Sequence, residues 1–301
     1  MADIRLTRRL ARLAEQIRKD IVEMVGCEGQ VGHLGGSCSA ADIIAVLYGY
    51  KMAFIPSAPD YPRRDKFLCS KGHAAIAQYA ALAEYGFFPR DELKTVKKLG
   101  SRLQGHPDRL KTPGIEAGTG SLGQGLSIAN GLALAMRLDG ADTKTYCLMG
   151  DGELAEGQIW EAAMASVNFK LDNIVGIVDK NKMQATGFTR ERFDIDPIPD
   201  KWRGFGWHVI EVDGHDVDAL VEAFDAADCV KGKPTVVIAD TIKGKGVRFA
   251  ENEAAFHNGM LTPAQYAAAL DEIDARIAGF GDIEWRVSKR VNTDGRPETH
   301  G

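Results

Sequence analysis

The 301-residue sequence lacks the features of a secreted, membrane-spanning or nucleic-acid-binding protein. Its five cysteines are scattered with no CxxC pair, so neither a disulfide framework nor a structural zinc site is expected. No apolar run is long enough to span a membrane, and no apolar signal core follows the N-terminus. The formal net charge of −5 disfavours a nucleic-acid backbone as partner. We therefore expect a cytoplasmic protein with reduced thiols and with neither a nucleic-acid nor a membrane partner.

Short apolar segments with strand character alternate with helical segments along most of the chain. The strands are expected at residues 66–69, 145–149, 173–178, 209–212 and 235–239, and the helices at 74–85, 123–138, 159–169, 217–229 and 262–280. This alternation predicts an α/β fold with a doubly wound, mainly parallel sheet and helices on both faces. Ligands of such sheets bind beyond the carboxyl ends of the strands. We expect a single domain over residues 1–301, with a polar tail from about residue 285 that is either mobile or docked on a partner.

Two helices are expected before this alternation begins. Apolar residues recur at helical spacing in the first 21 positions, namely at Leu6, Leu10, Leu13, Ile17 and Ile21. Basic residues lie among them and predict a solvated outer face, made of Arg5, Arg8, Arg9, Arg12, Arg18 and Lys19. Ser39 and Asp42 have the spacing of a capping-box variant and precede an apolar stretch at residues 43–48. We therefore predict that Ser39 caps a second helix, which a loop at 51–65 follows.

Polar side chains follow two of the predicted strands, thirty positions apart. Gly150-Asp151-Gly152 ends one strand, and Asp179-Lys180-Asn181 ends the next, with one helix between them. Adjacent parallel strands present their carboxyl ends at one sheet edge, so Asp151 and Asn181 are expected side by side. With the carbonyl oxygen of Met183 they would offer Mg²⁺ three of its six oxygens, and phosphates or water the rest. The alternative is an ordinary turn with a solvent-facing aspartate.

A glycine-rich segment at residues 118–125 runs into an alanine-rich helix. Exposed N–H groups at a helix start favour anions and polar ligand edges. The segment lacks the Lys-Ser/Thr ending of a nucleotide-binding loop, so an NTPase is not favoured. The alternative is a flexible turn before a closely packed helix.

Four of the seven histidines lie beside glycine or in short polar turns, at His33, His73, His106 and His257. Neutral imidazoles can bind hydroxyl groups and move protons near pH 7, so four in such loops predict one polar pocket. Each taken alone is equally compatible with a structural role. The remaining histidines, His208, His215 and His300, have no such context, and no role is predicted for them.

These segments, in this order, resemble the transketolase family over residues from about 5 to 270. The matching motifs are Gly32-His33-Leu34-Gly35-Gly36, Ser39-Ala40-Ala41-Asp42, Lys71-Gly72-His73, Gln104-Gly105-His106-Pro107, Gly120-Ser121-Leu122-Gly123-Gln124-Gly125, Gly150-Asp151-Gly152-Glu153-Leu154-Ala155-Glu156-Gly157, Asp179-Lys180-Asn181, Phe205-Gly206-Trp207, Asp213-Gly214-His215-Asp216 and Lys243-Gly244-Lys245-Gly246-Val247. One departure is Leu34, where many relatives have proline.

The resemblance implies a thiamine diphosphate cofactor and a role for each matching residue. Mg²⁺, or Ca²⁺ or Mn²⁺ in its place, would be bound by Asp151, Asn181 and the Met183 carbonyl. The cofactor would be contacted at its diphosphate by His73, Gly152 and His257, along its thiamine by Gly120, Ser121 and Leu122, and through the metal by Asn181. Glu156 resembles the family's acid that lies at the subunit interface, near the cofactor-activating glutamate of the partner, and it is counted among the cofactor-binding residues. The catalytic contacts to a ketose substrate would come from His33, His106 and His257.

The resemblance also implies a missing half, because a transketolase chain is about twice as long. The absent part carries the pyrimidine-binding domain and the glutamate that activates the cofactor. We expect a second polypeptide to supply both, in an α2β2 assembly that transfers a two-carbon ketol unit between sugars. The sequence does not specify which sugars.

Three other functions are compatible with parts of the pattern. A decarboxylase or 2-oxo-acid dehydrogenase subunit would share the metal motif but not the histidine loops. A magnesium-dependent phosphohydrolase built on Asp151 would need further carboxylates, for which Glu153 and Glu156 are the near candidates. A non-catalytic binding module related to the enzyme is the third.

Overall fold

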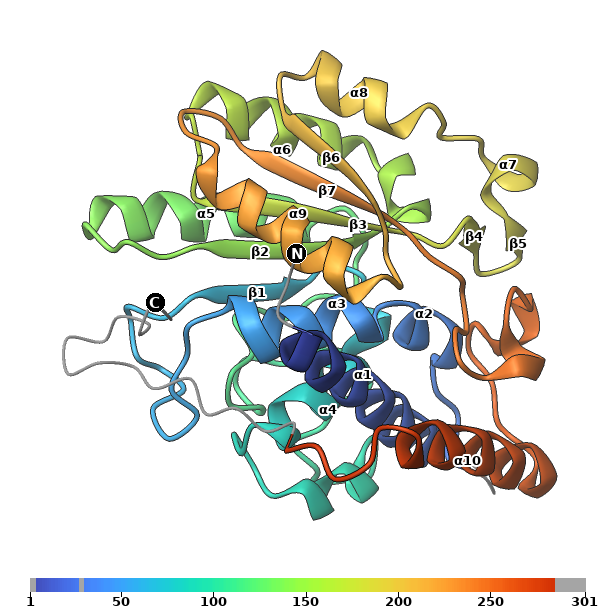
Figure 1. Ribbon diagram of the computed structural model, residues 1–301. Coiled ribbons are helices and arrows are strands. Elements are labelled where there is room, and N and C mark those ends of the chain that lie inside the picture. The colour runs from blue at the N-terminus through green and yellow to red at the C-terminus, as the bar shows by residue number, and fades with distance from the viewer. Residues whose placement is uncertain (1–3, 27–29, 285–301) are drawn as a thin grey trace.

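The computed structural model describes residues 4–26 and 30–284, so the predicted C-terminal tail lies outside the described residues. Its main sheet has five strands, all parallel, in the order β1 (Lys66–Cys69), β2 (Thr145–Gly150), β3 (Ile174–Lys180), β7 (Thr235–Asp240) and β6 (His208–Asp213) (Figure 1). The predicted parallel sheet is therefore confirmed. The central strand β3 is buried up to its last residue, which explains its almost wholly apolar sequence.

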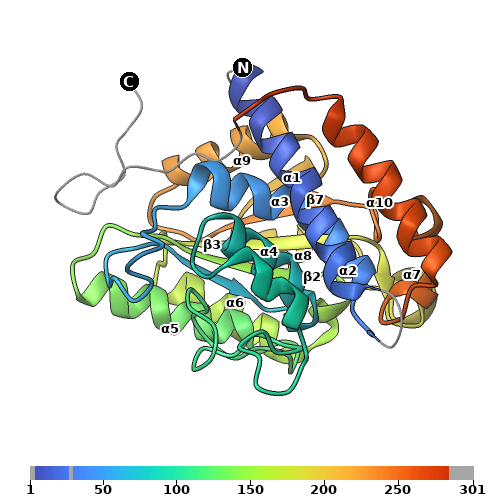
Figure 2. The same cartoon turned by 90° about the horizontal axis from the view of Figure 1, so that it is seen from below.

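Helices cover both faces of the sheet, as predicted (Figure 2). One face packs against α1 (Ile4–Val25), α3 (Ala41–Val46), α4 (Ala75–Glu84) and α9 (Val217–Cys229), and the other against α5 (Gly125–Leu138), α6 (Gly157–Asn168) and α8 (Ile198–Gly204). Successive residues of β2 alternate between the two cores: Tyr146 and Leu148 join the first, and Cys147 and Met149 the second. This alternation follows from the period-2 geometry of a strand.

The predicted solvated basic face of the first helix is wrong for Arg18 and holds only in part for Arg9, Arg12 and Lys19. Helix α1 packs against α3, α4 and α10 (Pro263–Ala278), so little of its surface faces solvent. Of the six basic side chains assigned to that face, only Arg5 and Arg8 are exposed. Arg18 is 3% exposed and forms ion pairs with Glu15 and Asp42. Asp42, a buried acid from another helix that the local pattern does not reveal, is what makes this position suitable for an arginine.

The predicted cap at Ser39 is also wrong. Ser39 is the last residue of a short helix, α2 (Leu34–Ser39), and the next helix, α3, has no side-chain cap. The Ser39 hydroxyl instead donates to Asp179 Oδ2 at 2.6 Å. Because α2 begins at Leu34, before the predicted helix start, Ser39 lies at its end and its side chain points toward the sheet edge.

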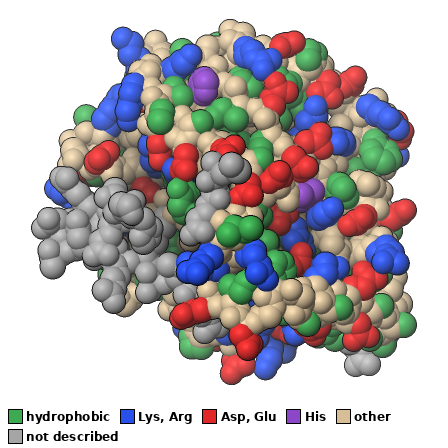
Figure 3. Space-filling view, in the orientation of Figure 1, with side chains coloured by type: hydrophobic (Ala, Val, Ile, Leu, Met, Phe, Trp, Pro, Cys, Tyr) green, Lys and Arg blue, Asp and Glu red, His purple; other side chains and the backbone are tan. Residues whose placement is uncertain are grey.

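Several short elements complete the fold. They are η1 (Leu47–Lys51), η2 (Gly72–Ala74), η3 (Arg90–Thr95), η4 (Gly152–Ala155), η5 (Arg248–Ala250), η6 (Ala254–Phe256), α7 (Thr189–Arg192) and an antiparallel pair, β4 (Met183–Gln184) and β5 (Gly187–Phe188). No described helix is both long and apolar enough to cross a membrane. Acidic and basic side chains are interspersed on the face seen in Figure 3.

Candidate functional site

A cavity of about 350 Å³ lies at the carboxyl ends of β1, β2, β3 and β7. Parallel pairing sets Gly150 of β2 opposite Asp179 of β3, so the residues that follow both strands meet at this edge. The structure thus brings Asp151 and Asn181 to one cavity, as the strand order requires. The residues predicted for the site that line the cavity are His73, Leu122, Asp151, Gly152, Glu156, Asn181, Met183 and His257.

Asp151 and Asn181 are oriented by backbone groups close to them. The carboxylate of Asp151 accepts from Gly152 N at 2.8 Å and from Lys182 N, and Asn181 Oδ1 accepts from Met183 N at 3.1 Å. Burial first, and then the charge of Asp179, raise the pKa of Asp151 to about 7. Ionising this carboxyl group in the folded chain costs free energy, and a cation beside it would offset that cost.

The oxygen donors of this edge fit a hard divalent cation. One carboxylate, one amide oxygen and one backbone carbonyl match the ligands that Mg²⁺ takes from proteins. No group of three or more His, Cys, Asp or Glu able to hold a metal occurs in the described residues, so zinc-type sites are not indicated there. The ammonium of Lys243 lies 3.5 Å from the Met183 carbonyl and 3.0 Å from that of Gln184, which shows that this edge accommodates positive charge.

Asp179 organises the floor of the cavity, a role that the sequence pattern did not reveal. Its side chain is fully buried and accepts hydrogen bonds from Lys71, Ser39 and Thr241, while Asn181 Nδ2 lies at 3.3 Å. Burial alone would raise the pKa of Asp179, but the charge of Lys71 and these hydrogen bonds outweigh it and lower the pKa. Lys71 therefore enters the cavity wall as a cation that Asp179 balances.

Lys243 is a second buried cation of the cavity that sequence reasoning missed. It is 2% exposed, and its Nζ lies 2.9 Å from His257 Nδ1. Burial, followed by the charge of Lys71, lowers the pKa of Lys243 to about 8. Both lysines lie in motifs that carry the family resemblance, but no role was predicted for either of them. Together they give the cavity a positive wall suited to a phosphate-bearing ligand.

The four loop histidines form one cluster, as predicted. The ring of His33 has its centroid 5.2 Å from that of His73, 6.0 Å from that of His106 and 5.4 Å from that of His257. Burial lowers the pKa of His33 and of His257 to about 4, and that of His73 to about 2, with nearby lysines and histidines adding to the effect. The pKa of His106 is also lowered, first by burial and then by Lys97. At neutral pH the cluster therefore consists of uncharged imidazoles, each able to donate one hydrogen bond and accept another.

Four predicted site residues do not line this cavity: His33, His106, Gly120 and Ser121. His33 and His106 join it through the histidine cluster. Gly120 packs under His106, since a Cβ placed on Gly120 would lie 2.8 Å from His106 Cδ2, and its φ of +150° also favours glycine. The side chain of Ser121 is exposed.

Glu153 has a structural use within the site. Its Oε1 accepts from Ser70 Oγ and, at 2.9 Å, from Gly123 N, and its Oε2 accepts from Gly150 N at 3.1 Å. Both oxygens are engaged in joining three loops of the cavity. This arrangement removes one of the two carboxylates that a phosphohydrolase would have needed.

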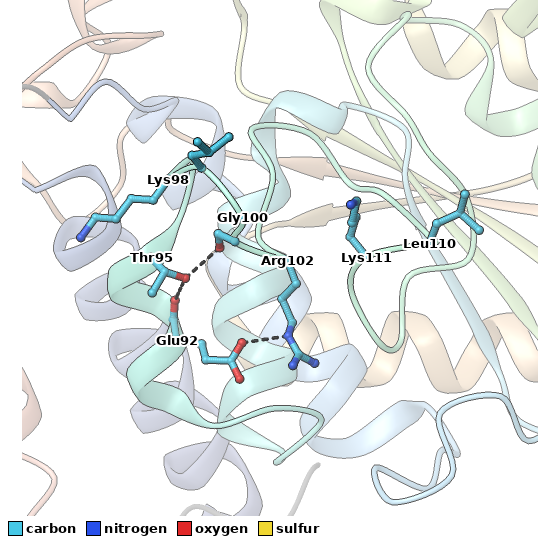
Figure 4. Close-up of a pocket in the computed structure, with 9 residues that line it drawn as sticks. Glu92, Thr95, Lys98, Gly100, Arg102, Leu110 and Lys111 are labelled. Atoms are coloured by element: carbon cyan, nitrogen blue, oxygen red, sulfur yellow. Dashed lines mark hydrogen bonds and ion pairs between the residues drawn. The ribbon is translucent and has the colours of Figure 1, made fainter.

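A second hollow, of about 690 Å³, lies in the loop between η3 and α5 (Figure 4). Its polar groups pair with one another: Arg102 Nε lies 2.8 Å from Glu92 Oε2, and Thr95 Oγ1 lies 2.8 Å from Ser101 Oγ. We assign no ligand to this hollow.

The fold, the oxygen donors and the positive wall define a protein that binds a phosphorylated cofactor at a sheet edge. The family model described as "Transketolase, thiamine diphosphate binding domain" matches residues 10–275. The chain is 45% identical over 265 residues to the 6-deoxy-6-sulfo-D-fructose transketolase subunit of Clostridium sp. (strain MSTE9), covering 88% of this chain and 96% of the relative. It is 42% identical over 264 residues to one of the subunits of the apulose-4-phosphate transketolase of Phocaeicola vulgatus (strain ATCC 8482), covering 88% and 93%. The chain belongs to the transketolase family.

Solved structures agree with this assignment. The transketolase of Leishmania mexicana superposes with a TM-score of 0.77 at 30% identity, covering 94% of this chain and 47% of that one. A transketolase variant from Pichia stipitis gives a TM-score of 0.80 at 29% identity, covering 91% and 46%. The chain therefore spans about half the length of these transketolases, but nearly the whole length of the two subunits named above.

Proposed function

We propose that this chain is the diphosphate-binding subunit of a two-chain transketolase, which transfers a two-carbon ketol unit from a ketose to an aldose. The supporting observation is the convergence of an oxygen-donor set, two buried lysines and four neutral histidines at one sheet edge. Thiamine diphosphate, when bound, supplies a stabilised carbanion to the reaction. The protein supplies binding, orientation and proton transfer.

The diphosphate end of the cofactor would lie against the positive wall of the cavity. Asp151, Asn181 and the Met183 carbonyl would hold a divalent cation, with Mg²⁺ proposed and Ca²⁺ or Mn²⁺ as substitutes. Gly152 has no side chain, and a Cβ there would lie 2.8 Å from Gln184 Cγ, so only glycine leaves this approach free. Gly120, Ser121 and Leu122 would line the thiamine, and Glu156 would face the partner chain.

The neutral histidines would act on the sugar. His33, His106 and His257 would hydrogen-bond the ketose hydroxyls and hold or release protons at their ring nitrogens. His73, which lines the cavity together with Asp151 and Lys243, would donate a hydrogen bond from its uncharged ring to the diphosphate. Uncharged imidazoles leave the binding of the anionic cofactor to the lysines. They can still accept and donate protons during the reaction.

A partner chain would complete the site. Two relatives with similar coverage are named as transketolase subunits, and the solved single-chain transketolases are about twice as long. We propose that the partner carries the pyrimidine-binding domain and the activating glutamate, in an α2β2 assembly in the cytoplasm. The two relatives act on sugars that bear a sulfonate or a phosphate, by their names. We propose an anionic sugar for this chain as well.

The proposal is tested by adding thiamine diphosphate and Mg²⁺ to the purified chain and measuring heat of binding and ketol transfer separately. We expect magnesium-dependent binding but no transfer until the partner chain is added. Robust transfer by the chain alone would contradict the two-chain proposal. Absence of cofactor binding with and without the partner would contradict the cofactor assignment.

A further inference from the structure

Three polar side chains, two of them buried and the third mostly buried, lie behind the cavity without lining it, on the face of the sheet that α1 and α3 cover. Asp42 Oδ2 contacts both Arg18 Nη2 and His215 Nδ1, the latter at 2.7 Å. Arg18 is 3% exposed, Asp42 7% and His215 12%. The three residues come from α1, α3 and the turn after β6, and we call them the buried relay. The chemistry proposed above does not use it.

The hydrogen bonds of the buried relay fix the state of its imidazole. His215 Nε2 lies 2.9 Å from the backbone N–H of Ile242, so this nitrogen accepts and carries no proton. The ring is therefore neutral, and its Nδ1–H donates to Asp42. The guanidinium of Arg18 balances the charge of Asp42. Such a chain of bonds sets the ring orientation, as outer partners do for metal-binding histidines.

Both ends of the buried relay hold one turn of the backbone. This segment, residues 242–246, is named here the lysine turn. Ile242 N–H donates to His215, and the Lys245 carbonyl accepts from Arg18 Nε at 3.2 Å. Two backbone groups, one on each side of Lys243, are thus tied to side chains of the buried relay.

Lys243 is the one residue of the lysine turn that lines the cavity. Its side chain passes over Gly35, where a Cβ would lie 3.0 Å from Lys243 Cγ. The Nζ atom then reaches Gln184 O at 3.0 Å and His257 Nδ1 at 2.9 Å. A small shift of the lysine turn would withdraw this ammonium from the cavity.

We infer that Arg18, Asp42 and His215 are positioning residues that hold the lysine turn, so that Lys243 reaches the cavity as a contact for an anionic diphosphate. The identity of that anion rests on the proposed function. The positioning itself rests only on the contacts of the protein. It is therefore measurable in the ligand-free chain.

The test compares three substitutions of one residue. In His215→Gln the amide oxygen can take the place of Nε2 and accept from Ile242, whereas in His215→Asn the amide can take the place of Nδ1 and reach only Asp42. His215→Ala loses both bonds. His208→Ala, at the other end of β6, is the matched control. Hydrogen–deuterium exchange of a peptide over residues 241–247 reports on the lysine turn, and calorimetry with inorganic diphosphate and thiamine diphosphate reports on binding.

We expect exchange of the lysine turn to be at least about tenfold faster in His215→Ala and His215→Asn, and close to wild type in His215→Gln and His208→Ala. Affinity for both diphosphates should fall on the order of tenfold in the first two variants only. Peptides from β2 should exchange as in the wild type, which separates positioning from general destabilisation.

Equal protection of the lysine turn in all variants, or rescue by Asn as complete as by Gln, would overturn the inference. If His215→Ala does not fold, the comparison of Gln with Asn decides the question. A wild-type chain that binds inorganic diphosphate but not thiamine diphosphate would contradict the proposed function, while the exchange data would still test the buried relay.

Discussion

Replacing Asp151 by asparagine should stabilise the ligand-free chain while removing its cation site. The pKa of Asp151 rises from 3.8 to about 7 on folding, because burial and the charge of Asp179 oppose its ionisation. A raised pKa favours folding fully below pH 3.8, and this contribution is lost as the pH rises to about 7. At 1.36 kcal/mol per pH unit, the ionised carboxylate costs about 4 kcal/mol above pH 7.

Asparagine avoids this cost but keeps only one acceptor oxygen. The N–H groups of Gly152 and Lys182 both donate to the carboxylate, so one of them loses its acceptor, at a cost of about 1.5 kcal/mol. The net gain of Asp151→Asn at pH 8 is therefore about 3 kcal/mol, or roughly 5 °C in Tm. At pH 5 the ionisation cost is only about 2 kcal/mol, close to the cost of the lost acceptor, so the gain should nearly vanish.

Thermal unfolding of the chelator-treated chain at pH 8 and pH 5 measures this difference. Asp240→Asn is the control, because Asp240 is 57% exposed at the end of β7, which β3 separates from β2. In calorimetry, Asp151→Asn should also lose magnesium-dependent cofactor binding. A Tm at pH 8 equal to or below that of the wild type would refute the reasoning, and so would a gain that persists unchanged at pH 5.

Three further changes test other parts of the protein. His106→Ala should lower turnover of the reconstituted enzyme about a hundredfold with little effect on cofactor affinity; steady-state kinetics and calorimetry would place His106 at the diphosphate if the pattern were reversed. Gly120→Ala forces a Cβ to 2.8 Å from His106 and should lower the free energy of unfolding by about 1–3 kcal/mol, whereas Gly131→Ala, with open space around it, should raise it by about 0.5–1 kcal/mol. Equal effects in urea unfolding would refute that account. Arg64→Met leaves Glu116 buried without its ion-pair partner and should cost about 3–5 kcal/mol in the same assay; a loss below about 1 kcal/mol would show that the pair contributes little.

The sequence by itself determined the sheet, its cofactor edge and the family. Asp151 and Asn181 directly follow two apolar strands with one helix between them, and parallel pairing alone then puts both at one edge. The four loop histidines were likewise predicted to share a pocket, because they flank those motifs. In each case the signal is local: for Asp151 and Asn181 it is a strand and the turn after it, and for the histidines it is a glycine or a short polar turn beside the ring.

Only the tertiary structure decided the charges beneath that edge. The sequence predicted that Ser39 caps a helix, yet its hydroxyl donates to Asp179. It predicted Arg18 on a solvated face, yet this side chain forms an ion pair with Asp42. The partners of these side chains are 140 and 24 positions away. A charged side chain is buried at an acceptable cost in free energy only when an opposite charge lies beside it. The path of the chain over the sheet, rather than local sequence spacing, decides which residues become such neighbours.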